Sequence, residues 1–206
     1  MEWFRRFADV PNVGYIGNSA IDRQSLPGYN AVPKDFASAT GKEYDILTWP
    51  NGTTSPASVR GAAPAFGTEA FFTNSAHKSL QRMYEALELP GTLSDYHFVI
   101  QNCCQQLWDY HMRRKDPWVY NEIEKLSWLD IRLVEAYPEI VKFNGNDGTV
   151  YATIVAFSFL ISLYKQEGYL HEALDVAKRA VKFDQLHYVL EELMQKVSML
   201  EAEDVE

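Results

Sequence analysis

The sequence predicts a mainly α-helical protein: a helical bundle or α-solenoid-like domain over residues 74–206, preceded by an extended, irregular arm over residues 1–73. Turn-forming residues gather in the arm, where six of the nine prolines and seven of the eleven glycines lie within residues 1–67. From residue 75 onward, apolar residues recur every three or four positions, which is the period of a helix with one buried face. The arm therefore lacks the helical pattern that defines the rest of the chain.

The arm is unusually rich in aromatic residues. Disordered segments are typically poor in them, whereas this stretch carries eleven: Trp3, Phe4, Phe7, Tyr15, Tyr29, Phe36, Tyr44, Trp49, Phe66, Phe71 and Phe72. We therefore favour an arm that is ordered by packing on its own domain or on a partner, with a disordered tail as the alternative. The segment EYDILTW, followed by a turn sequence at Pro50–Gly52, fits one short β-hairpin.

Three helices are expected between residues 75 and 138, each bounded by residues that start or stop helices. Serine and aspartate cap helix starts, proline suits the first turn but not the interior, and a Pro-Gly pair ends a helix. These signals place the helices at residues 75–89, from Ser94 to Arg114, and from Asp116 to Pro138. A loop over residues 144–148 follows.

A helix–turn–helix pattern comes next. Large apolar residues recur along a first helix, a glycine marks the turn, and small residues recur along a second helix: Phe157, Leu160, Tyr164, Gly168, Ala173 and Ala180. This pattern, over about residues 154–187, resembles one tetratricopeptide repeat, a unit of about 34 residues. The resemblance implies two closely packed helices and a surface of the kind that binds peptides or other subunits.

The resemblance is confined to a single degenerate unit. Ile161, Ala177 and Gln185 depart from the usual residue types, and a second copy shifted back along the chain would place Asp130 and Glu139 at core positions. A lone repeat cannot bury its own apolar face. We therefore expect it to stack between the preceding helices and a final helix over about residues 185–202.

A membrane span is not expected. Residues 148–164 form a run of 17 uncharged residues, whereas a spanning helix needs about 20 predominantly apolar ones. Because this run includes two threonines and two serines, a buried helix explains it better. The first ten residues also lack an apolar stretch long enough for a secretory signal.

Charge and cysteine content narrow the classes of partner and compartment. The net charge of −9 makes this an acidic, soluble type of sequence and argues against nucleic acid as a partner, since phosphate binding requires clustered Lys and Arg. Cys103 and Cys104 are the only cysteines, and neighbours in sequence rarely bridge. No disulfide framework is available, so we expect an intracellular, reducing compartment: the cytoplasm or an organelle interior.

No catalytic, cofactor-binding or metal-binding residues are predicted. His97, Cys104 and His111 are spaced by seven, so one helical face could carry them. Seven residues span ~10.5 Å along a helix axis, too far for both imidazoles to reach one metal ion or for either to activate the cysteine. We expect core side chains instead, and phosphate-loop, dinucleotide, nucleophile-elbow and zinc-protease motifs are all absent from the sequence.

These observations predict a protein-interaction or scaffold subunit of a larger, multi-subunit protein assembly. The candidate contact residues are aromatic, and each could instead pack within its own core: Trp3, Phe4, Trp49, Trp108, Trp118 and Trp128. One alternative is an acidic inhibitor or immunity-type protein, which requires negative charge concentrated on one face. The other is an enzyme without a recognisable motif, which requires a cleft that gathers His97 or His111 with carboxylates from another helix.

Overall fold

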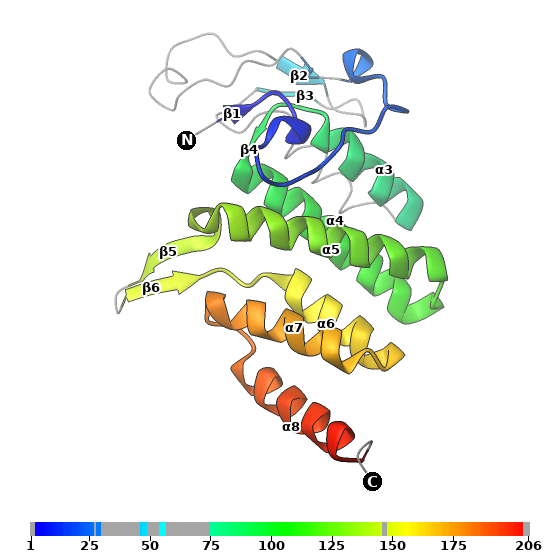
Figure 1. Ribbon diagram of the computed structural model, residues 1–206. Helices are drawn as coiled ribbons and strands as arrows, with labels where there is room; N and C mark the ends of the chain where they lie inside the picture. Colours follow the sequence, from blue (N-terminus) through cyan, green and yellow to red (C-terminus); the bar gives the residue numbers. More distant parts are fainter. Residues whose placement is uncertain are drawn as a thin grey trace.

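The computed structural model describes residues 3–26, 28–29, 46–48, 54–56, 75–145 and 148–203, and within these six α-helices follow one another along the chain (Figure 1). The mainly helical fold is therefore confirmed. Their bounds are as follows: α3 Ala76–Leu87, α4 Leu93–Arg114, α5 Pro117–Ala136, α6 Val155–Glu167, α7 Leu170–Ala180 and α8 His187–Glu203. Short 3-10 turns lie at Phe7–Asp9, Arg23–Ser25, Pro138–Val141 and Val181–Phe183.

Most helix boundaries follow the expected local signals, with one correction. Ser94 is not the cap of α4, which begins one residue earlier and is capped by Thr92. The Thr92 hydroxyl accepts from the Asp95 amide at 3.2 Å, and the Asp95 carboxylate accepts from the Thr92 amide at 2.8 Å. This reciprocal pair satisfies two N–H groups at once, which a single serine cap cannot do. Pro117 does open α5 as expected.

Each helix packs against the next one along the chain, and α4 also contacts α6. In Figure 1, α5 and α7 lie in front of α4 and α6, so the helices form two layers with α8 at one end of the stack. Gly168 makes the tight connection between α6 and α7, because it adopts a left-handed conformation with φ of 84° that other residues rarely tolerate.

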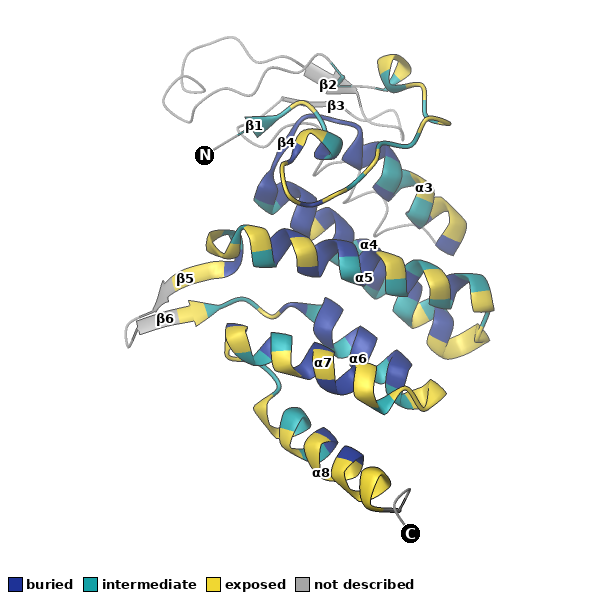
Figure 2. Ribbon diagram, viewed as in Figure 1, coloured by how far each residue is buried: buried dark blue, intermediate teal, exposed yellow. Residues whose placement is uncertain are grey.

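Helix α6 is buried on nearly every side and joins two hydrophobic cores (Figure 2). Phe159 and Leu163 belong to a core shared with the arm, α3, α4 and α5. Phe157, Leu160 and Tyr164 belong to a second core with α7 and α8. No helix in the described residues is long and apolar enough to cross a membrane.

Three two-stranded antiparallel pairs accompany the helices. Strands β2 (Ile46–Thr48) and β3 (Thr54–Pro56) pair as the expected hairpin requires, although its turn lies outside the described residues. Strands β5 (Lys142–Gly145) and β6 (Gly148–Tyr151) form a second hairpin. The loop expected over residues 144–148 was therefore partly wrong, because three of its residues belong to the two strands.

The described part of the arm packs on its own helical domain. Strand β1 (Trp3–Phe4) pairs with β4 (Gly91–Thr92), the short strand between α3 and α4. Phe7, Val10 and Val13 are buried in the same core as α3, α4 and α5. The interpretation of an arm ordered on its own domain therefore holds for these residues.

Glu88, at the end of α3, ties the arm in place through polar contacts. Its side chain is almost fully buried, and its carboxylate accepts a hydrogen bond from the Asn18 amide at 2.8 Å. The same carboxylate lies 3.7 Å from the Arg6 guanidinium, and the Glu88 carbonyl accepts from Arg23 Nε at 2.7 Å. Three points of the arm therefore converge on one residue.

Phe7→Ala should destabilise the protein by about 3–5 kcal/mol, the usual result of truncating a fully buried phenylalanine. The Phe7 ring lies 5.2 Å from the Tyr15 ring and 5.0 Å from the Tyr96 ring, so its loss leaves a cavity between arm and domain. Urea unfolding measures the change. Phe143→Ala, on the exposed face of a hairpin, is the matched control and should shift stability by less than about 0.5 kcal/mol. Equal effects of the two substitutions would contradict the packing of the arm.

Candidate functional site

One face of α6 is only partly covered along the stack. Its residues recur at helical spacing, so their side chains share that face: Ser158, Ile161, Ser162, Lys165 and Gln166. A cavity of about 410 Å³ lies between this face and α8. A second cavity of about 420 Å³ lies between the end of α6 and the corner joining α4 to α5. Gln166 lines both cavities, and we refer to the two cavities together as the α6 groove.

The α8 side of the groove combines an exposed aromatic residue with an ion pair. Tyr188 lines the cavity while 72% of its surface remains exposed. Lys165 of α6 donates to the Glu192 carboxylate of α8 at 3.0 Å, which links the two helices across the groove. Hydrogen bonds from Lys196 and Lys165 lower the pKa of Glu192 to about 2. Glu192 therefore keeps its charge at any physiological pH.

The corner end of the groove contains His111. This side chain is 5% exposed and lies between the rings of Trp108 and Tyr120, at 6.0 and 6.2 Å. Its Nδ1 atom is buried without a hydrogen-bond partner in the described part of the chain. Burial, with a smaller contribution from the Lys115 ammonium, lowers the pKa of His111. A neutral imidazole here can donate one hydrogen bond and accept another.

The surroundings of His111 are polar and carry both charges. Lys115 from the end of α4 and Glu167 from the end of α6 line the same cavity. Asn121 of α5 and the half-exposed Tyr169 complete it. The arrangement therefore offers donors and acceptors for polar groups, and the α8 side offers polar side chains together with apolar surface.

A second polar feature lies inside the protein, between α4 and α5. His97 Nδ1 and Asp130 Oδ1 are 2.7 Å apart, and the two side chains are 0% and 1% exposed. Burial lowers the pKa of His97, but the attraction and hydrogen bond of Asp130 outweigh it, and the pKa is raised. Cys104, also expected in the core, is buried there. Burial raises its pKa well above the ordinary value, so it is not an activated thiol.

Sequence reasoning missed the importance of Asp130. It was noted only as an unsuitable core residue for a second repeat, yet it does occupy a core position. The available signal was an aspartate at an apolar-period position of α5, which implies a buried cationic or hydrogen-bonding partner. The spacing could not identify that partner, because His97 lies 33 residues away on another helix.

The aromatic residues predicted as partner contacts pack within the protein. Trp3 and Phe4 are half-buried in β1. Trp108 stacks on Phe159 with ring centroids 4.8 Å apart, and the Trp118 ring lies 4.1 Å from that of His77. Trp49 lies outside the described residues.

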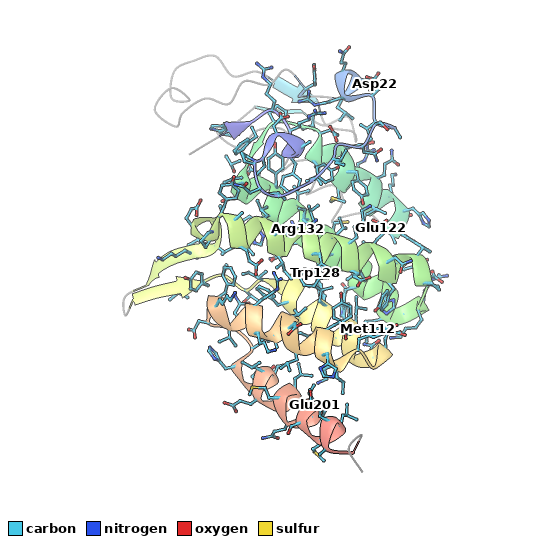
Figure 3. The ribbon with its side chains drawn as sticks, in the orientation of Figure 1. Asp22, Met112, Glu122, Trp128, Arg132 and Glu201 are labelled. Carbon is cyan, nitrogen blue, oxygen red and sulfur yellow. The ribbon has the colours of Figure 1, made fainter. Side chains whose placement is uncertain are left out.

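Trp128 is held by polar contacts as well as by packing. It points from α5 toward α6 and α7 (Figure 3), and its indole N–H donates to the Tyr164 hydroxyl at 2.9 Å. The Arg179 guanidinium lies 5.3 Å from the centre of its ring. None of the described candidate aromatics lines the α6 groove. Their contact with a partner stays a prediction.

No family model, curated protein or solved structure matches this chain. Within the described residues, no group of three or more histidine, cysteine or acidic side chains is placed to hold a metal ion. The geometry of the α6 groove is therefore the basis for a functional proposal.

Asp130→Asn should destabilise the protein by about 3–5 kcal/mol at pH 6, because it leaves the other member of a buried ion pair without its counter-charge. The pKa of His97 in the folded protein is raised above its value of about 6.5 in the unfolded chain. Below that pH the ion pair therefore makes its full contribution to the free energy of unfolding. Its contribution is lost as the pH rises through the folded pKa.

Urea unfolding at several pH values between 6 and 9 tests this prediction. The gap in unfolding free energy between the wild type and Asp130→Asn should narrow as the pH rises. Asp175→Asn, on the exposed face of α7, is the control and should leave the pH profile unchanged. A gap that is constant with pH would show that His97 is not protonated beside Asp130.

Proposed function

We propose that this chain is a protein-interaction subunit of a larger assembly and that the α6 groove binds a segment of a partner protein. One observation carries the proposal: two cavities share Gln166 and follow a single face of α6 from α8 to the α4–α5 corner. Neighbouring cavities lined by both apolar and polar side chains suit a chain segment.

The dimensions of the groove support a short peptide as ligand. From Ser158 to Gln166 the face of α6 is about 12 Å long at about 1.5 Å per residue. An extended peptide rises about 3.3 Å per residue, so about four ligand residues fit along it, with the corner cavity beyond. Leu186, Tyr188 and Val189 supply apolar contact for one or two ligand side chains.

The negative charge of α8 favours a partner segment that is basic. Helix α8 carries four glutamates against one lysine, and Glu191 and Glu201 are exposed. Because complementary charge raises association rates and excludes like-charged partners, we expect lysine or arginine next to the apolar ligand residues. An acidic inhibitor-type protein would also bind a basic partner, so the two functions differ in whether the partner is blocked or assembled.

A tetratricopeptide-repeat-like unit over about residues 154–187 is part of the proposal. Helix α6, the left-handed Gly168 and helix α7 support it, as does the packing of α8 against α7.

An enzyme is the second candidate, because the corner cavity gathers His111 with Glu167, a carboxylate from another helix. Neither cysteine lines it, and both thiols are buried. Substitution of His111 by Gln separates the candidates: peptide binding at the α8 end should persist, whereas general acid–base catalysis through His111 would be lost.

Selection of random peptides against the full chain tests the proposal, with affinities of the enriched peptides measured by titration. Ser162→Arg should weaken binding at least about tenfold, because a long charged side chain would fill the cavity. Tyr188→Ala should weaken it by a similar factor, since it removes the exposed aromatic contact.

Two matched controls lie on the outer face of α8. Ser198→Arg and Met199→Ala repeat the chemistry at exposed positions outside the groove, and both should bind as the wild type does. Thermal unfolding confirms that each variant is folded. Peptides that bind equally well to all four variants would contradict the assignment of the α6 groove.

A further inference from the structure

Two neighbouring arginines at the end of α4 have no acidic partner among the residues that the structure describes. Arg113 and Arg114 are exposed, and no carboxylate of the described residues lies within ion-pair distance of either. Asp109, one turn earlier, directs its carboxylate to Gln105.

Three other arginines of the described residues pair with carboxylates. Arg6 pairs with Asp9 and lies near Glu88, and Arg82 pairs with Glu85. Arg179 pairs with Glu135 at 2.8 Å. Two adjacent guanidinium groups without such neutralisation form a local concentration of positive charge, which attracts an external anion.

Both arginine side chains are held in place rather than extended into solvent. Arg113 Nε donates to the Asp109 carbonyl oxygen at 2.9 Å, which leaves its two terminal NH₂ groups for a ligand. The Arg114 guanidinium lies 5.7 Å from the centre of the Tyr110 ring, a cation–π contact. Preorganised side chains lose less entropy when a ligand binds.

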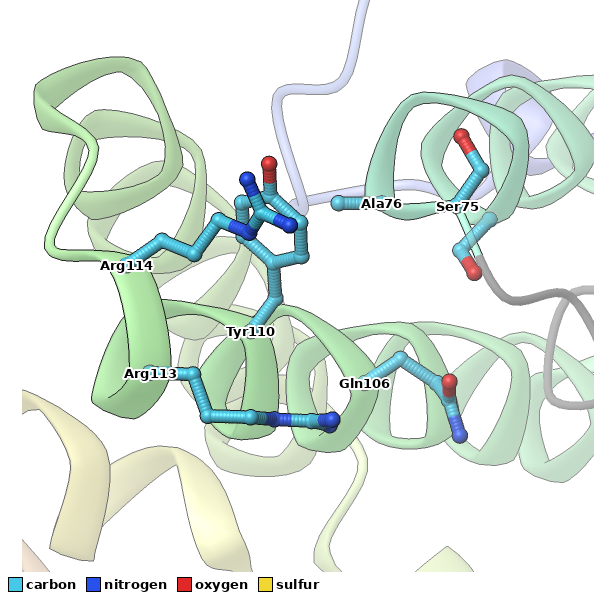
Figure 4. Close-up of a pocket in the computed structure, with 7 residues that line it drawn as sticks. Ser75, Ala76, Gln106, Tyr110, Arg113 and Arg114 are labelled. Atoms are coloured by element: carbon cyan, nitrogen blue, oxygen red, sulfur yellow. The ribbon is translucent and has the colours of Figure 1, made fainter.

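The two guanidinium groups border one cavity, which lies between the last turns of α4 and the start of α3 (Figure 4). Its volume is about 470 Å³, within the ~300–1,000 Å³ of small-ligand sites. Gln106, Tyr110, Arg113 and Arg114 recur at helical spacing, so one face of α4 forms its wall. In Figure 4, Arg113 runs along α4 toward Gln106, and Arg114 crosses Tyr110 toward Ala76.

We propose that this cavity binds a phosphate monoester through Arg113 and Arg114. Guanidinium groups present planar, parallel N–H donors that match phosphate oxygens. The start of α3 faces the same cavity at Ala76, and the positive end of its helix dipole adds to the attraction. The cavity is larger than a phosphate ion, so it also accommodates the group that carries the phosphate, with Gln106 and Tyr110 alongside.

This site is separate from the α6 groove. His111 and Lys115, which line the groove, lie on a different face of α4 from the arginine pair. The phosphate site therefore does not depend on the proposed peptide binding, and either assignment could fail while the other stands.

Titration of the ¹⁵N-labelled full chain with inorganic phosphate, followed by NMR at low ionic strength, tests the inference. Saturable shifts are expected at the Arg113 and Arg114 side chains and at the start of α3. Arg113→Gln and Arg114→Gln should each weaken binding by about tenfold, the usual effect of removing a charged hydrogen-bond donor. Arg5→Gln, an exposed arginine elsewhere in the chain, is the matched control and should bind as the wild type does.

A phosphoserine peptide and its unphosphorylated form then distinguish the source of the phosphate. Tighter binding of the phosphopeptide than of inorganic phosphate supports a phosphorylated protein side chain, and equal binding supports a small phosphate ester. Binding that is unaffected by both arginine substitutions, or shifts that never saturate, would overturn the proposal. Thermal unfolding of each variant excludes loss of structure as the cause.

Discussion

The burial of α6 is the constraint on which the rest of the structure depends. Seven of its thirteen residues are buried and apolar or aromatic, so no single neighbour can cover it. Phe159 and Leu163 require α4 and α5, whereas Phe157, Leu160 and Tyr164 require α7 and α8. Because the two hydrophobic cores meet on α6, this helix is buried only when α4 and α5 lie on one side of it and α7 and α8 on the other. The strip of α6 left only partly covered is then fixed by the packing, and it becomes the groove.

Polar contacts fix how the helices and the arm are aligned relative to one another. Hydrophobic contact alone is tolerant of small shifts, but the buried His97–Asp130 pair holds only one alignment of α4 and α5. The same applies to the arm, where Glu88 accepts hydrogen bonds from two distant points of the chain. The positions of His111 and of the arginine pair on α4 follow from that alignment, so the two proposed binding surfaces depend on interior contacts far from them.

Local signals in the sequence predicted the helices well, because Pro117, Pro138 and Gly168 act on their immediate neighbours. Long-range contacts were not predictable in this way. The pairing of Trp3–Phe4 with Gly91–Thr92 leaves no local pattern in the sequence. Asp130 contacts His97 only through the packing of α4 against α5, which residue spacing does not indicate. The α6 groove draws on α4, α5, α6 and α8, so it exists only through their packing. The tryptophans were predicted as contacts because large aromatic residues suit interfaces and cores equally.

The central claim, that the partly covered face of α6 receives a partner segment, is tested most directly by hydrogen exchange of the full chain with and without a bound peptide. The account predicts slower exchange confined to α6, the first turns of α8 and the α4–α5 corner, with the arm and α3 unchanged. Protection that appears at α3 and the arm instead, or a bound peptide that leaves α6 unaltered, would contradict it.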